Sequence, residues 1–108
     1  MITSTFNLAS GVMMLHTNGD LLSSNSEAAA QAFEVALTQN PKYKALWVDC
    51  TSSKMIDSVG LNLLFNVLTQ AKERKAGTKI IIAKGGLERI LQAAQIAMMF
   101  PVEVRARG

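Results

Sequence analysis

Two short apolar runs separated by a helix-length segment constrain the fold of this chain most. The runs are Ala45–Cys50 (ALWVDC) and Thr78–Ala83 (TKIIIA), and each is too short to form a helix of its own. Both favour buried β-strands, the second because it is rich in β-branched residues. Between them, Val59–Lys75 is amphipathic with a helical period, and Ala76–Gly77 provides a C-terminal stop. A strand, a crossover helix and a second strand predict two parallel strands of one sheet.

The N-terminal part of the chain predicts a β-hairpin. Ile2–Leu8 and Val12–His16 are short apolar-rich runs, and the glycine-bearing segment Ala9–Gly11 lies between them. A loop of this kind joins two antiparallel strands. Asn18–Asp20 then closes the second strand.

Two further helical patterns complete the element order. Ser24 and Glu27 match a capping box, which predicts that a helix begins there and continues until Asn40–Pro41 stops it. Its apolar residues recur at helical spacing: Ala29, Ala32, Phe33, Ala36 and Leu37. Gly85–Gly86 precedes the last pattern, formed by Leu87, Ile90, Leu91 and Ala94. Val102–Arg105 fits either a short strand or a helical turn. The chain therefore predicts an α/β fold over residues 1–108, with a mostly parallel, mixed sheet of four to five strands packed against helices.

Composition excludes several classes of protein. The chain has 108 residues, 49% of them hydrophobic and 18% charged, which is typical of one globular domain. Its apolar runs are far shorter than the ~20 residues of a membrane span, and its N-terminus lacks the pattern of a signal peptide, so we expect a soluble, cytoplasmic protein. The single cysteine, Cys50, indicates a small buried residue rather than a disulfide or a metal site. Of the +3 net charge, only Lys72, Arg74 and Lys75 cluster, which favours a solvated helix end over a nucleic-acid surface.

The loop after the strand Ala45–Cys50 holds the candidate site. Asp57, Ser58 and Gly60 lie where that strand gives way to the helix, and the carboxyl ends of parallel strands are where functional groups gather. Either Asp57 or Ser58 could cap the helix, but one cap needs only one side chain. Gly60 in the first turn costs up to ~1 kcal/mol relative to alanine, which favours a close approach at this position.

The helix that follows has a leucine outside its core face. At 100° per residue, the core face is centred near Leu68. It comprises Leu61, Leu64, Phe65, Leu68 and Ala71. Leu63 lies well outside this stripe and Val67 on its border, so Leu63 is a candidate for the apolar part of a docking surface near Ser58. From this geometry we expect Ser58, Asn62, Leu63 and Asn66 to face a partner.

The segment ALWVDCTSSKMIDSVGLNLLFNVLTQAKERKAGTKIIIA, residues 45–83, resembles the central part of STAS domains, specifically the bacterial anti-sigma factor antagonists. In those proteins an apolar strand ending in Asp leads to a D-S-x-G-L sequence and a long helix. Gly19–Leu21 resembles the family's G-x-L motif, and LERILQAAQIAMMFPV resembles its closing helix and apolar tail. The resemblance runs through nearly the whole chain and implies the STAS fold.

The resemblance also implies a function for each residue of the motif. Ser58 would be phosphorylated by a serine kinase that is itself the anti-sigma factor, and only the unphosphorylated form would bind that kinase. A phosphatase of the PP2C class would reset the state. Asp57 matches the acid that orients the hydroxyl or its surroundings, and Gly60 would let a partner backbone come close. One position departs from the family, because Leu22 stands where many active antagonists carry an acid.

Other functions compete with this one. A STAS subunit of a transporter or of a stressosome-type complex needs no phosphorylation switch. A hydrolase would use Ser58 as nucleophile and His16, the single histidine, as base, but the first glycine of the G-x-S-x-G elbow is missing. Gly85–Gly86 lacks the lysine and serine of a P-loop, which disfavours a nucleotide site. The prediction is a binding protein without enzymatic activity, cofactor, metal or nucleic-acid and membrane contacts, with a weak homodimer left open.

Overall fold

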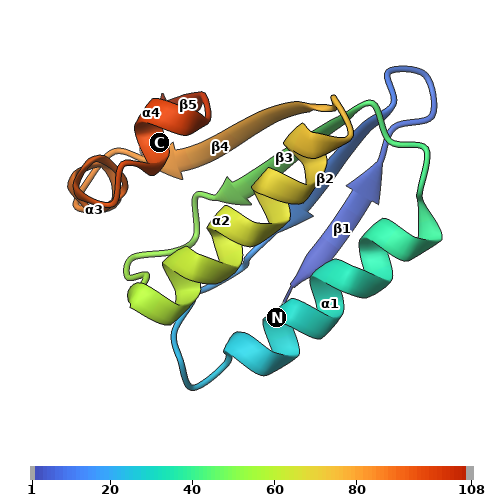
Figure 1. The fold of residues 1–108 in the computed structure, drawn as a ribbon. Helices are drawn as coiled ribbons and strands as arrows, with labels where there is room; N and C mark the ends of the chain where they lie inside the picture. The colour runs from blue at the N-terminus through green and yellow to red at the C-terminus, as the bar shows by residue number, and fades with distance from the viewer. Residues whose placement is uncertain (1, 107–108) are drawn as a thin grey trace.

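A five-stranded sheet runs through the computed structural model, which describes residues 2–106 (Figure 1). Its strands are β1 (Thr3–Phe6), β2 (Val12–His16), β3 (Ala45–Cys50), β4 (Gly77–Ala83) and β5 (Val102–Arg105). They lie side by side in sequence order, with β1 antiparallel to β2 and every other pair parallel. The predicted hairpin and mostly parallel mixed sheet are confirmed, and the undecided last segment is a strand. Met1, Arg107 and Gly108, which the predicted domain includes, lie outside the described residues.

Four helices connect the strands in residues 2–106. They are α1 (Ser26–Gln39), α2 (Ser58–Glu73), α3 (Leu87–Ala93) and α4 (Ile96–Met99). The last predicted helical pattern, Leu87 to Ala94, corresponds to α3, and α4 is a further short helix that the sequence did not predict. The chain breaks between them because Gln95 takes a left-handed conformation, with φ of 63°.

The predicted capping box of the first helix is wrong. Helix α1 begins at Ser26, so the N-cap position belongs to Asn25 and not to Ser24. The Asn25 side chain makes no cap hydrogen bond. Its Oδ1 accepts from the N–H of Leu22 at 3.0 Å, and its Nδ2 donates to the carbonyl of Asp20 at 2.8 Å. The Asn25 side chain therefore fixes the conformation of the loop before the helix, and this loop forms part of the candidate site.

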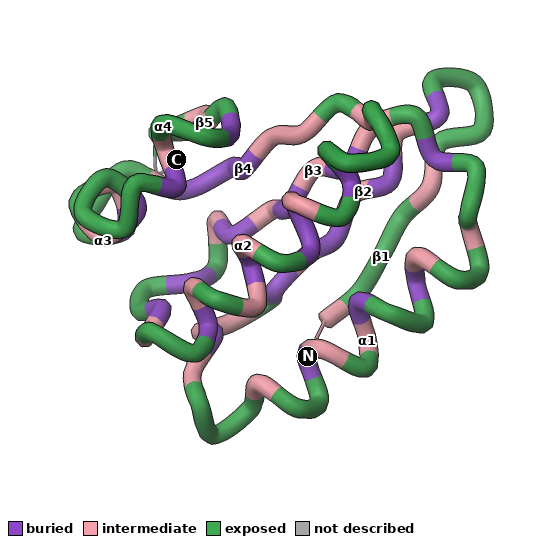
Figure 2. The backbone as a smooth tube through the Cα atoms, viewed as in Figure 1, coloured by how far each residue is buried: buried purple, intermediate pink, exposed green. Residues whose placement is uncertain are grey.

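The core lies on one face of the sheet. Buried and less buried residues alternate along β2 and β3, because successive side chains of a strand point to opposite faces. Figure 2 shows buried positions along the strands and along α2. The fully buried core includes Leu15, Val48, Ile80, Leu64, Leu68 and Leu91. Cys50 is buried in the same core, and burial raises the pKa of its thiol to about 12, so it is an apolar core residue as expected.

The opposite face of the sheet carries polar pairs. Lys79 Nζ lies 4.0 Å from the centroid of the Trp47 ring and 3.3 Å from Oε1 of Glu103. His16 Nδ1 lies 2.9 Å from Oδ2 of Asp49 on the neighbouring strand. These contacts join side chains of neighbouring strands across this face.

No helix within residues 2–106 combines the length and the hydropathy that crossing a membrane requires.

We expect Leu64→Ala to lower the free energy of unfolding by about 2–5 kcal/mol, because the Leu64 side chain is fully buried where α2 packs on the sheet. Leu8→Ala is the matched control, since Leu8 is 88% exposed in the β1–β2 loop and its truncation leaves no cavity. Urea denaturation of both variants measures the difference. Equal losses in the two variants would contradict this placement of the core.

Candidate functional site

The candidate site forms where two loops lie side by side at the carboxyl edge of the sheet. Leu21, in the loop between β2 and α1, pairs with Ile56, in the loop between β3 and α2. The N–H of Leu21 donates to the carbonyl of Met55 at 3.2 Å, and the N–H of Asp57 donates to the carbonyl of Leu21 at 3.1 Å. The first loop thus continues the sheet ladder directly beneath the start of α2.

Asp57 holds both loops with one carboxylate. Its Oδ1 accepts from the N–H of Gly60 at 2.9 Å and caps α2, and its Oδ2 accepts from the N–H of Ser23 at 2.7 Å. These hydrogen bonds favour the charged form, that from Gly60 most, and hold the pKa of Asp57 below its usual value. The choice of cap that the sequence left open is therefore settled as Asp57. Its expected part in orienting the neighbouring hydroxyl stays a prediction.

Asp20 makes a second bridge between the same loops. Its Oδ1 accepts from the N–H of Lys54 at 2.8 Å and from that of Met55 at 3.1 Å, and these bonds lower the pKa of Asp20. The two carboxylates therefore join the loops reciprocally. Asp20 belongs to the first loop and accepts from N–H groups of the second, and Asp57 belongs to the second loop and accepts from an N–H group of the first.

A buried hydroxyl pair lies below these bridges. Thr17 and Ser53 are both 2% exposed, and their hydroxyl oxygens lie 2.7 Å apart. Ser53 also donates to the carbonyl of Gly19. Since both hydroxyls have partners, the loops meet without leaving these polar groups unsatisfied in the core.

Gly60 permits a close approach, but the segment that approaches it is part of this chain. A Cβ on Gly60 would lie 2.2 Å from the carbonyl oxygen of Leu21. That space is already filled, and Gly60 is buried. The expectation that Gly60 admits the backbone of a partner is therefore wrong, because the backbone that approaches it belongs to the chain's own first loop.

Ser58 is the first residue of α2, and it is exposed. Two apolar side chains lie near it in sequence: Met55, which is 52% exposed, and Val59, which is 43% exposed. Neither residue was predicted from the sequence to belong to the exposed surface near Ser58. Val59 could have been found, because its position on the helical wheel falls outside the core stripe. The exposure of Met55 depends on the path of an irregular loop, which no periodicity describes.

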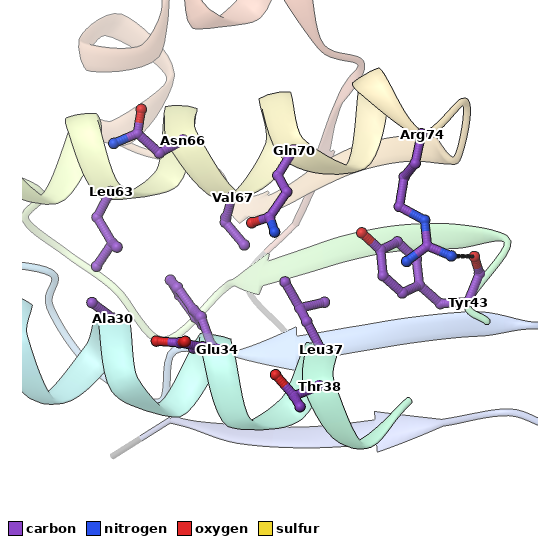
Figure 3. A pocket seen from close by; sticks show the side chains of 11 residues that line it. Ala30, Glu34, Leu37, Thr38, Tyr43, Leu63, Asn66, Val67, Gln70 and Arg74 are labelled. Carbon is purple, nitrogen blue, oxygen red and sulfur yellow. Dashed lines mark hydrogen bonds between the residues drawn. The ribbon is translucent and has the colours of Figure 1, made fainter. Parts of the chain in front are cut away.

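The structure separates the other predicted partner-facing residues. Asn62 and Asn66 are exposed on α2 as expected. Leu63 is partly buried against the core, and Figure 3 shows it pointing from α2 toward Ala30 of α1, into a groove of about 390 Å³ between the two helices. The prediction that Leu63 stands clear of the core is wrong. Helix α1 packs beside α2 and extends the buried arc to Val67, which is 6% exposed.

The residues of two alternative sites from the sequence make other contacts or belong to a turn. His16 directs Nδ1 to Asp49 and has Nε2 3.4 Å from the Thr5 hydroxyl, so its ring nitrogens engage other groups than Ser58. Gly86 takes the N-cap position of the short helix α3 and serves as a turn.

Leu22, at the position where the family often carries an acid, is half-buried and donates its N–H to Asn25.

A family comparison decides the classification. The model of the STAS domain matches residues 6–106. This chain belongs to the STAS domain family. No curated protein matches it significantly.

Solved structures share the fold of this STAS domain. An anti-sigma factor antagonist from Mycobacterium paratuberculosis superposes with a TM-score of 0.73 at 20% identity, over 95% of this chain and 86% of that one. The Bacillus cell fate determinant SpoIIAA in its phosphorylated form gives a TM-score of 0.64 at 10% identity, over 100% of this chain and 92% of that one. The anti-sigma factor antagonist SpoIIAA in its unphosphorylated form gives 0.62 at 11%, over 100% and 90%.

We expect Gly60→Ala to destabilise the STAS domain by about 1–3 kcal/mol, because the new methyl group would overlap the carbonyl of Leu21 and force the two loops apart. Gly86→Ala is the control, since a Cβ there meets no atom within 4 Å. Thermal unfolding of the two variants checks this. A Gly60→Ala variant as stable as Gly86→Ala would show that the loops do not pack as described.

The stability supplied by Asp57 should depend on pH. Its folded pKa lies below the unfolded value of 3.8, so its contribution is fully present above that value and is lost as pH falls through the folded pKa. Asp57→Asn should therefore melt below the wild type near neutral pH, and the difference should shrink as the pH falls below 3.8. Melting curves across that range measure it. A difference that stays constant with pH would remove the carboxylate from this role.

Proposed function

We propose that this STAS domain is an anti-sigma factor antagonist that binds a serine-kinase anti-sigma factor and releases it when Ser58 is phosphorylated. The observation that carries the proposal is the exposed Ser58 hydroxyl at the first position of α2, on a loop fixed from both sides by acids. In this role the domain works in the cytoplasm as a binding protein and not as an enzyme. Its binding would free a sigma factor and so regulate transcription.

The surface around Ser58 suits a partner that recognises the unmodified form. Val59 and Met55 offer exposed apolar area, and Asn62, one turn along α2 from Ser58, adds an exposed amide. Apolar area rimmed by polar groups is typical of protein contact sites. The partner would cover the Ser58 hydroxyl when it docks here.

Phosphorylation at this position changes charge without changing the scaffold. A phosphate adds about −1.5 to −2 charges beside the Asp57 carboxylate. The N-terminus of α2 stabilises that charge within the chain, whereas a partner fitted to a neutral hydroxyl meets a bulky anion. A penalty of roughly 3 kcal/mol weakens binding on the order of 100-fold.

The scaffold tolerates the change because Ser58 does not hold it together. The loops are joined through Asp57, Asp20 and the Leu21–Ile56 pair, and each of these uses groups other than the Ser58 hydroxyl. An exposed phosphate is also open to a PP2C-type phosphatase. The switch is therefore local and reversible.

Leu22 favours a second candidate function. The half-buried leucine puts no acid where many active antagonists carry one, and Asp20 is already occupied by the N–H groups of Lys54 and Met55. A STAS subunit of a transporter or stressosome-type complex does not need the kinase contact. It would bind its partner whether or not Ser58 carries a charge.

A comparison of two serine variants distinguishes these functions. Wild type, Ser58→Glu and the control Ser52→Glu, whose serine is exposed in the same loop, are each used to capture proteins from the native host's lysate. The antagonist function predicts that wild type and Ser52→Glu retain a small ATP-binding kinase and that Ser58→Glu loses it by about 100-fold. Mass spectrometry identifies the retained proteins and, after incubation with ATP, locates phosphate on Ser58.

Two results would count against the proposal. Retention of transporter or scaffold subunits equally by all three proteins would favour the second candidate. A phosphate on serines other than Ser58 would place the switch elsewhere. Val59→Asn, which removes exposed apolar area without adding a charge, should also weaken the capture of the kinase.

A further inference from the structure

Strand β1 leaves one edge of the sheet unpaired. Among the strands of residues 2–106 it is the outermost and pairs only with β2, and its Thr3, Ser4 and Thr5 are exposed. The N–H of Asn7 donates to the carbonyl of Val12, and in an antiparallel pair the hydrogen-bonded residues alternate. Ser4 and Phe6 therefore direct their N–H and C=O groups away from β2, where another strand can pair with them.

This edge lacks the charged side chains and prolines that protect many edge strands. Lysines, prolines and inward-pointing charges normally prevent edges from pairing. The segment Ile2–Asn7 (ITSTFN) contains none of these residues. The opposite edge is different, because β5 follows Pro101 and carries Glu103 and Arg105, paired at 2.6 Å. The chain thus protects one edge and leaves the other open.

An uncharged groove runs along the open edge. It has a volume of about 520 Å³ and lies between β1 and α1, which run beside each other on the same side of the molecule (Figure 1). Ile2, Ala28, Ala32 and Val35 supply its apolar part, and Val35 is 54% exposed. The remaining lining residues are alanine or neutral polar residues. A strand added to β1 would place alternate side chains over this groove.

We propose that a second copy of this chain pairs its β1 antiparallel with β1, about a two-fold axis perpendicular to the sheet. Ser4 of one copy then lies opposite Phe6 of the other, and the pairing joins two sheets into one. The same axis brings the two α1 helices together over Ala32 and Val35. A copy is the partner that fits, because the two-fold axis presents the same strand and the same apolar helix face from both sides, and because neutral surfaces meet neutral surfaces.

The dimer leaves the Ser58 surface of each copy free. The axis reverses the strand direction between copies, so the two carboxyl edges, with their Ser58 loops, lie at opposite ends of the joined sheet. The inference is therefore independent of the proposed function.

A proline variant tests the pairing without disturbing the fold. Ser4→Pro removes an N–H that points away from β2, so the β1–β2 ladder is retained while a second strand is excluded. Ser4→Ala keeps the N–H and is the matched control. On α1, Val35→Glu places a charge in the interface, and Met98→Glu, at a residue 84% exposed elsewhere, is its control.

Sedimentation equilibrium over about 5–500 µM measures the oligomeric state, a range that brackets weak homodimers. We expect wild type, Ser4→Ala and Met98→Glu to form dimers, and Ser4→Pro and Val35→Glu to be at least 10-fold weaker. Circular dichroism confirms that each variant is folded. A monomeric wild type, a Ser4→Pro variant that dimerises like Ser4→Ala, or assembly beyond a dimer would overturn the proposal.

Discussion

The carboxylate of Asp57 joins the two halves of the site. With one oxygen it accepts the N–H of Gly60 and begins α2, and with the other it accepts the N–H of Ser23 and fixes the neighbouring loop. The depressed pKa of Asp57 follows from these same bonds. The position of Ser58 depends on this geometry, because the Asp57 cap determines where α2 begins.

The packing of the two loops against each other constrains the residue type at two positions. Gly60 is in contact with the Leu21 carbonyl, and Asp20 accepts two N–H groups from the second loop. Such a site is preorganised, since its loops are held by hydrogen bonds from backbone N–H groups to the Asp20 and Asp57 carboxylates rather than by the residue that would be modified. Under the proposed function, a charge added at Ser58 would change the surface that a partner meets and would leave the fold unchanged.

The functional surface and the open edge occupy different parts of one sheet. The Ser58 surface lies at the carboxyl ends of the parallel strands, where α2 begins, whereas the β1 edge lies on the hairpin side beside α1. The antiparallel strand β1 therefore provides the surface that would bind a second copy. That surface is separate from the one that would bind a regulator.

The sequence by itself determined the order of elements as far as α3, the parallel β3–α2–β4 unit, the hairpin and the place of Ser58 at a strand-to-helix junction. These follow from hydrophobic period and turn residues, which are local. Only the tertiary structure decided that Asp57 reaches Ser23, 34 residues away, and that the close approach to Gly60 comes from Leu21. It also decided that Leu63 is partly buried, because a helical wheel counts one helix and cannot include a neighbour that packs beside it.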